Sequence, residues 1–197
     1  MIKYVCFDLD GVLFAPTCFK YFKAKVSELT KKPEIIDEVF HGDKMDDFKR
    51  GIISELVFWA YADTELGLNL GINGYYGLLK NCYVLQPEIL AFVQELKSKG
   101  KRISICTNNF PTRIRAAHDA TGFLDLIDTA ILSYEVGSLK PDKLIYQALI
   151  DRSGCEPSEI FYSDDNEDKL KGAIDLGIQC VATTSISSLI EQIKDRI

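Results

Sequence analysis

The chain has 197 residues, of which 47% are hydrophobic, and a formal net charge of −6 at pH 7. This length fits one large domain, or a core domain that carries a smaller insertion. The acidic balance and the lack of a dense Lys/Arg block argue against a nucleic-acid-binding surface, and no stretch approaches the roughly 18 uninterrupted apolar residues of a membrane span.

The six cysteines form neither a CxxC pair nor a Cys/His metal-binding spacing. Cys6, Cys106 and Cys180 lie inside apolar, strand-like runs, where cysteine behaves as a small hydrophobic residue. Residues 1–15 do not read as a signal peptide, because Asp8 and Asp10 interrupt the apolar segment. We therefore expect reduced thiols and a cytoplasmic protein. We also expect a monomer or homodimer that binds no nucleic acid and no membrane.

Predicted strands and helices alternate along most of the chain. The predicted strands are 2–8, 102–107, 129–133, 159–164 and 180–184. The predicted helices between and after them are 87–99, 111–121, 142–153, 167–176 and 185–196. This alternation is typical of a parallel sheet covered by helices on both faces, so we expect a Rossmann-like α/β fold.

One interval interrupts the alternation. Residues 9–101 separate the first two strands, whereas a crossover needs only about a dozen residues or more. Most of this interval reads as helices, at 17–31, 33–40, 43–50, 54–66 and 73–82. We expect a helical cap of residues 16–85, inserted after the first strand and lying over its carboxyl end, and a core of residues 1–15 and 86–197.

Polar side chains follow the predicted strands where each strand ends. Asp8 and Asp10 follow the first strand, Thr107, Asn108 and Asn109 follow the second, Lys140 follows the third, and Asp164 and Asp165 follow the fourth. Ligands bind outside the carboxyl ends of the strands in open parallel sheets. Each group alone is compatible with a solvated turn or a helix cap, but together they are the side chains that hold a divalent cation and a phosphate.

Four motifs follow one another along the chain: DLDGV around Asp8, TNN at Thr107, GSLKPD around Lys140 after LSYEVG, and IFYSDD, which ends at Asp165. In these four ordered motifs the sequence resembles the haloacid-dehalogenase-like superfamily, in its subgroup with a helical cap after the first motif. FKRGIISELVFW, at 48–59, is similar to a stretch often seen in the caps of this family. The resemblance covers nearly the whole chain.

The resemblance implies a role for each motif. Asp8 would be the nucleophile that forms an aspartyl-phosphate, and Asp10 the acid and base that serves the leaving alcohol and then water. Mg²⁺ would be held by the Asp8 carboxylate, the backbone carbonyl of Asp10, and Asp165. Thr107 and the backbone around Asn108 would bind the phosphate, and Lys140 would offset its charge.

The expected function is a magnesium-dependent phosphatase for a small phosphorylated metabolite, with a sugar phosphate as the expected class. Dehalogenases of the family generally lack the second acid, so Asp10 favours phosphoryl transfer. A phosphomutase, a haloacid-dehalogenase-type hydrolase and a non-catalytic phosphate-binding protein remain alternatives. A signalling receiver module fits less well, because receivers have no long insertion after the first strand.

Two points stay open from the sequence. Relatives often carry an Asp or Asn four residues after the metal-binding acid, whereas this chain has Lys169, so Asp164 or Asp168 would take the outer position. The sequence also leaves open which cap residues contact the substrate; the candidates are Thr17, Lys20, Tyr21 and Lys44. Lone His41 and His118 are interpreted as structural or exposed, and Trp59 as part of the cap core.

Overall fold

A five-stranded parallel sheet, in the order β3-β2-β1-β4-β5, lies at the centre of one half of the molecule. The computed structural model describes all residues 1–197. The strands are β1 (Tyr4–Phe7), β2 (Arg102–Thr107), β3 (Thr129–Leu132), β4 (Ile160–Asp164) and β5 (Gln179–Ala182). The predicted Rossmann-like sheet is confirmed, and every predicted strand end lies within two residues of the observed one.

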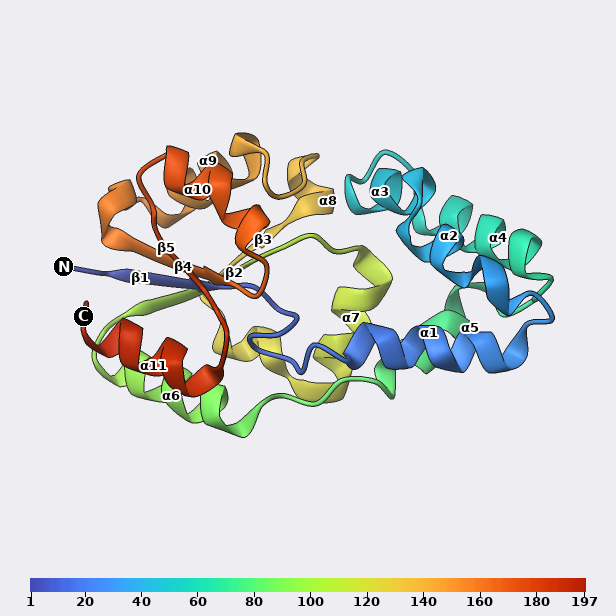
Figure 1. The fold of residues 1–197 in the computed structure, drawn as a ribbon, viewed down its shortest axis with the longest axis horizontal. Helices are drawn as coiled ribbons and strands as arrows, with labels where there is room; N and C mark the ends of the chain where they lie inside the picture. Colours follow the sequence, from blue (N-terminus) through green and yellow to red (C-terminus); the bar gives the residue numbers. More distant parts are fainter.

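Helices cover both faces of the sheet (Figure 1), as the predicted fold requires. They are α6 (Pro87–Ser98), α7 (Pro111–Thr121), α8 (Ser133–Val136), α9 (Lys143–Ser153), α10 (Lys171–Asp175) and α11 (Ile186–Lys194). The helix expected at 167–176 begins as a 3₁₀ turn at Glu167–Leu170 before α10. The short α8 was not predicted, because four residues are too few to show a helical period.

Alternate residues of β1 face opposite layers of the core. Tyr4 and Cys6 belong to a cluster with side chains of α9 and α10, whereas Val5 and Phe7 belong to the larger cluster that includes residues of α6, α7 and α11. Successive side chains of a strand point to opposite faces of the sheet. A strand buried on both faces therefore needs the continuous apolar run that 4–7 provides.

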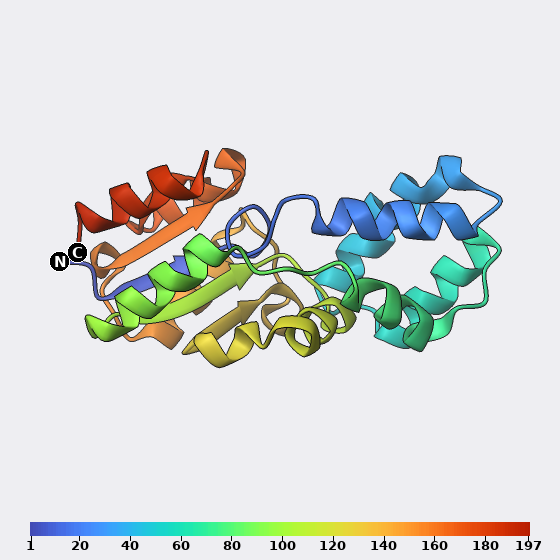
Figure 2. The same ribbon diagram turned by 90° about the horizontal axis from the view of Figure 1, so that it is seen from below.

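A helical unit lies beyond the carboxyl ends of the strands (Figures 1 and 2). It consists of α1 (Cys18–Leu29), α2 (Ile36–His41), α3 (Asp43–Lys49), α4 (Glu55–Leu66) and α5 (Gly71–Lys80). The helix expected at 33–40 is a 3₁₀ turn at Pro33–Ile35 followed by α2, and α5 begins and ends two residues before its predicted bounds.

The two connections between the helical unit and the sheet run side by side. Phe14 forms an antiparallel bridge with Leu85, and the Gln86 side-chain amide donates to the carbonyl of Val12 at 2.7 Å. One hydrophobic cluster of 39 buried residues extends from the sheet into the helical unit. The division into a core and a cap at residues 16 and 85 stays a prediction.

Aromatic side chains fill the junction between the helical unit and α7. The Phe110 ring stacks on Phe48 with centroids 5.0 Å apart, and Trp59 stacks on Tyr75 at 4.3 Å. Nε1 of the fully buried Trp59 donates to Oγ1 of Thr112 on α7 at 2.7 Å. Trp59 is therefore a core residue, as interpreted from the sequence, and it also joins the helical unit to α7.

No helix in the structure combines the length and the apolar character needed to cross a bilayer. The cytoplasmic location and the monomeric or homodimeric state stay predictions.

We expect Phe110→Ala to lower the free energy of unfolding by about 3–5 kcal/mol, because it leaves a cavity among rings that cannot close around it. Urea unfolding of wild type and variant measures the difference. Val84→Ala is the control, since Val84 is 71% exposed. A loss below about 1 kcal/mol for Phe110→Ala would show that this junction does not depend on the aromatic packing.

Candidate active site

The predicted site residues meet because of the order of the strands. Asp8 directly follows β1, which lies between β2, ending at Thr107, and β4, ending at Asp164. The Asp8 backbone N–H donates to the carbonyl of Ser163 at 2.8 Å, which continues the β1–β4 ladder by one residue. Asp8, Thr107 and Asp164 are all buried.

Lys140 is the centre of the site. Its fully buried ammonium nitrogen lies 2.9 Å from Oδ1 of Asp8 and 2.6 Å from Oδ2 of Asp164. It also donates to the Tyr162 hydroxyl at 2.9 Å and to the Cys106 carbonyl at 3.0 Å. A buried charge is tolerated only when such partners surround it, so Lys140 is not the exposed turn lysine that its sequence context also allowed.

One lysine charge is shared between two carboxylates, and the pKa values reflect this. Burial raises the pKa of Asp8 to about 6, with Lys140 opposing the rise and Asp164 adding to it. Burial acts in the same direction on Asp164, but Lys140, Lys169 and the Tyr162 hydroxyl together hold the pKa of Asp164 below its usual value. Burial would lower the pKa of Lys140, yet the charges of Asp8 and Asp164 raise it.

Three carboxylates lie close enough together to share a cation. Oxygens of Asp8, Asp164 and Asp165 all lie within 4.8 Å of one another. Gly11, at φ +73°, allows Asp165 to come near, since a Cβ there would be 2.5 Å from Oδ2 of Asp165. Three carboxylates against one buried lysine leave negative charge uncompensated, which suits a hard divalent cation with oxygen ligands. The residues present therefore fit Mg²⁺.

Asn108 holds the lysine loop in place. Its side-chain amide donates to the carbonyl of Lys140 at 3.0 Å, and its oxygen accepts from the N–H of Lys140 at 2.7 Å. Oγ1 of Thr107 accepts from Asn109 at 3.4 Å and donates to no protein acceptor, so its proton is available to a ligand. The structure thus assigns the Asn108 side chain a positioning contact that the sequence did not suggest.

Asp10 is paired with an arginine that sequence reasoning missed. Nη2 of Arg113 donates to both carboxylate oxygens of Asp10, at 2.6 and 2.8 Å, and Nε donates to the Tyr83 hydroxyl. The guanidinium also lies over the ring of Phe19, 4.4 Å from its centroid. Burial would lower the pKa of Arg113, but Asp10 and Tyr83 raise it. The only sequence signal was an arginine on the apolar side of the helix at 111–121.

Lys169 and Asp168 have different environments. Nζ of Lys169 lies 3.9 Å from Oδ1 of Asp164, whereas Asp168 is exposed and is not part of the carboxylate cluster. Asp164, rather than Asp168, is the acid that accompanies Asp165. Asp164 also accepts the N–H of Asn166 at 3.0 Å, which closes the turn after β4.

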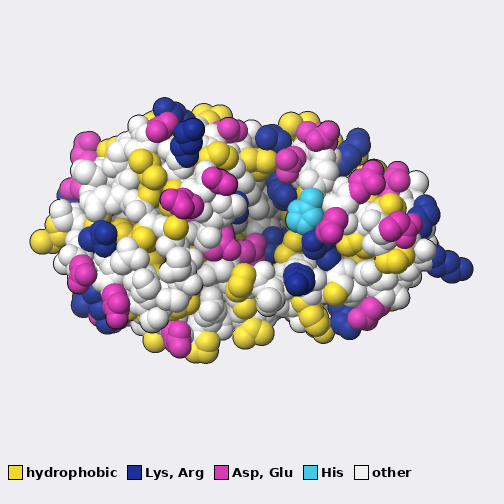
Figure 3. Space-filling model, in the orientation of Figure 1, with side chains coloured by type: hydrophobic (Ala, Val, Ile, Leu, Met, Phe, Trp, Pro, Cys, Tyr) yellow, Lys and Arg dark blue, Asp and Glu magenta, His cyan; other side chains and the backbone are white.

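A cavity of about 400 Å³ separates the sheet half from the helical unit, with Asp10 and Asn108 on its wall. Figure 3 shows the hollow between the two halves, with charged side chains of both signs along it. Phe19, His41 and Lys49 line the cavity from the helical unit. His41 is exposed, in agreement with its interpretation from the sequence.

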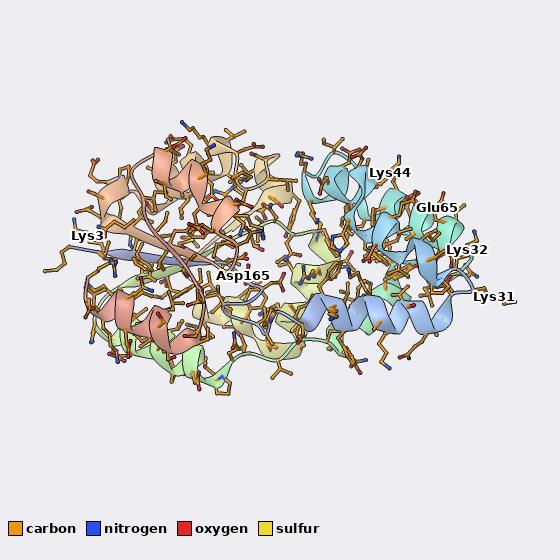
Figure 4. The ribbon with its side chains drawn as sticks, viewed as in Figure 1. Lys3, Lys31, Lys32, Lys44, Glu65 and Asp165 are labelled. Atoms are coloured by element: carbon orange, nitrogen blue, oxygen red, sulfur yellow. The ribbon has the colours of Figure 1, made fainter.

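The four residues named from the sequence as candidates for contacting the substrate do not line this cavity. Thr17, Lys20 and Tyr21 line a separate surface pocket, and Lys44 lies over the ring of Tyr61. Figure 4 shows Lys44 on the helical unit, well away from Asp165. The sequence left these candidates open because it did not show which side of each helix faces the strand ends.

The comparisons with known proteins identify the family. The model of haloacid dehalogenase-like hydrolases matches residues 2–177, so the chain belongs to the haloacid dehalogenase-like hydrolases. A phosphatase of Mycobacterium tuberculosis is 27% identical over 190 residues, covering 87% of this chain and 82% of its own length. A glyceraldehyde 3-phosphate phosphatase of Methanothermobacter thermautotrophicus is 25% identical over 212 aligned positions, covering 100% of this chain and 91% of its own.

The fold is also found among solved structures. A variant of a HAD family enzyme from Bacteroides thetaiotaomicron, in complex with magnesium and inorganic phosphate, superposes with a TM-score of 0.79 at 21% identity. The match covers 96% of this chain and 99% of that one.

We expect Asp8→Asn to stabilise the metal-free protein. The raised pKa of Asp8 means that its charged form costs stability, a cost that is absent below the unfolded-state pKa and complete once the pH exceeds about 6. Thermal unfolding in EDTA should therefore show a Tm increase of several degrees near pH 8, since about 1 kcal/mol shifts Tm by roughly 2–4 °C. Near pH 4.5 the increase should be much smaller.

Lys140 keeps Asp164 as its partner in this variant, so no unpaired charge is created. The control is Asp175→Asn, because Asp175 pairs with Lys143 on the surface. An Asp8→Asn protein that loses stability near pH 8 would contradict this description of the site.

We expect Arg113→Met to destabilise the protein because it leaves Asp10 and Tyr83 without their partner. Breaking a fully buried pair costs roughly 3–5 kcal/mol, and the 31% exposure of the Asp10 side chain reduces this. Arg115→Met is the matched control, since Arg115 pairs with Glu55 at the surface and should cost at most about 1 kcal/mol. Urea unfolding measures these losses, and adding Asp10→Asn to Arg113→Met should recover part of the lost free energy of unfolding. If the losses of the two single variants simply add in the double variant, Asp10 and Arg113 are not coupled.

Proposed function

We propose that this hydrolase is a magnesium-dependent phosphatase that acts on a small phosphorylated metabolite. The observation that carries the proposal is the pairing of Asp8 with Lys140 beside a second acid, Asp10, at the wall of a cavity. The magnesium and phosphate in the Bacteroides enzyme, and the phosphatase activity named for two relatives, support it. The cavity of about 400 Å³ is in the range of small-ligand sites.

In the proposed first step, a carboxylate oxygen of Asp8 attacks phosphorus and the bond from phosphorus to the ester oxygen breaks. Asp10 gives a proton to the departing alkoxide, which leaves as an alcohol. In the second step, Asp10 takes a proton from water, whose oxygen attacks the aspartyl-phosphate. Inorganic phosphate leaves, and the Asp8 carboxylate is restored.

The other side chains bind and orient the phosphate. Lys140 offsets the negative charge that gathers on Asp8 and the phosphoryl group, and Thr107 donates its free hydroxyl proton to a phosphate oxygen. Asp8 and Asp165, with the backbone carbonyl of Asp10, would hold Mg²⁺, and Asp164 lies beside them. When bound, Mg²⁺ would reduce the repulsion between the anionic nucleophile and the anionic substrate.

Asp10 favours a phosphoester over a haloacid. A halide ion leaves without a proton, whereas an alkoxide is a poor leaving group that needs one. Arg113, which also donates to the Tyr83 hydroxyl, holds Asp10 at the cavity wall, where it can reach a leaving group. A second acid held in this way has no evident use in dehalogenation.

The test is phosphate release from a panel of sugar phosphates, nucleotides and phosphoamino acids, with magnesium and with EDTA. We expect magnesium-dependent release from small esters and a loss of at least about a thousandfold in kcat for Asp8→Asn, because the neutral amide of Asn is a much weaker nucleophile than a carboxylate. Asp151→Asn, an exposed substitution on α9, is the matched control.

Three outcomes would overturn the proposal. No phosphate release from any ester with magnesium present would leave a phosphate-binding protein. Conversion of a sugar phosphate to its isomer would indicate a mutase. Halide release from a 2-haloacid would indicate a dehalogenase.

A further inference from the structure

The cavity beside Asp10 carries more positive charge than the phosphoryl site needs. Lys49, Arg113 and Lys169 line it, whereas Asp10 is the only acid on its wall. Arg113 is paired with Asp10 through Nη2 and donates to Tyr83 through Nε. Lys49 and Lys169 are therefore the two cations of the cavity that are left to bind a ligand, in a chain whose net charge is −6.

Neither lysine has a close ion pair. Nζ of Lys49 lies 3.5 Å from Asp46, and Nζ of Lys169 lies 3.9 Å from Asp164, whose Oδ2 is already occupied by Lys140 at 2.6 Å. The side chains of Lys49 and Lys169 are only 19% and 31% exposed. Partly buried cations with weak partners gain free energy when an anion reaches them.

The cations of the cavity also act on one another. Burial lowers the pKa of Lys49, and the positive charges of Arg113 and Lys169 lower it further against the opposing charge of Asp46. Like charges gathered in one small cavity repel one another unless a ligand carries the opposite charge.

The sheet half fixes the position of Lys49. The Ser133 hydroxyl donates to the backbone carbonyl of Lys49 at 2.7 Å, and it accepts the N–H of Asn109 at 2.9 Å. Gly51 approaches the carbonyl of Tyr134 so closely that a Cβ there would lie 2.3 Å from it. Lys49 is thus held opposite the strand ends by the contacts of residues 49–51 with α8.

We propose that Lys49 and Lys169 form a second anion site, and that the substrate is a phosphate monoester that also carries a carboxylate or a second phosphate. Lys140 and Thr107 serve the phosphoryl group that is transferred, whereas Lys49 and Lys169 bind the acidic group at the other end of the molecule. This inference rests on the proposed phosphatase activity and narrows its substrate class.

The test compares substrates that differ in the second acidic group. The pairs are 3-phosphoglycerate against glyceraldehyde 3-phosphate, and fructose 1,6-bisphosphate against fructose 6-phosphate. We expect kcat/KM to be at least about tenfold higher for the acidic member of at least one pair, which equals about 1.4 kcal/mol of transition-state stabilisation. The first pair tests a carboxylate and the second tests a phosphate.

The variants Lys49→Gln and Lys169→Gln should each reduce that ratio severalfold, mainly by raising KM for the acidic substrate. Lys44→Gln is the matched control, since Lys44 lies on α3 with Lys49 but is exposed and outside the cavity. Two separate lysine variants keep the test decisive if one of them folds poorly.

A binding measurement tests the same site without turnover. Phosphonoacetate and ethylphosphonate differ in a carboxylate and resist hydrolysis, so we expect phosphonoacetate to raise Tm more in wild type and the difference to shrink in Lys49→Gln. Equal kcat/KM values within both pairs, or equal Tm shifts for the two phosphonates, would overturn the second anion site while leaving the phosphatase intact. Failure of every ester to release phosphate would instead overturn the proposed function.

Discussion

The site depends on one buried charge, the ammonium group of Lys140. It contacts Asp8 and Asp164 at the ends of two adjacent strands, and the reciprocal hydrogen bonds of Asn108 hold its backbone against the end of a third. Lys140 is the one fully buried positive charge beside three carboxylates, and Lys169 adds only a longer contact with Asp164, at 3.9 Å. Burial raises the pKa of Asp8 and Asp164 adds to the rise, while the excess of carboxylates makes the cluster suited to Mg²⁺.

The helical unit completes this site by docking on α7 and α8. Trp59 donates to Thr112, and Phe48 stacks on Phe110. The next residue of α7, Arg113, links Phe19 of the helical unit with Asp10. A shift of the helical unit would therefore move Asp10 as well as change the size of the cavity.

Much of the site could be predicted because it follows the strands. Asp8, Thr107, Lys140 and Asp165 each come at or after a recognisable apolar run, and parallel strands bring their carboxyl ends to one edge. Arg113 and Lys49 could not be predicted in the same way. They lie on helices, where side chains a few residues apart point in different directions, and only docking decides which of them reach the cavity. The four candidates from the sequence lie outside the cavity for the same reason: on α1, Phe19 faces the cavity while Lys20 and Tyr21 line another pocket.

The sequence by itself determined the family, the parallel sheet and the carboxylate, hydroxyl and lysine groups at the strand ends, because strand periodicity and motif order are local properties. The tertiary structure alone decided that Asp10 is held by Arg113, that Asp164 shares Lys140 with Asp8, and that Lys49 and Lys169 enter one cavity. Those contacts join residues far apart in the chain, and their geometry is set by how the helices pack.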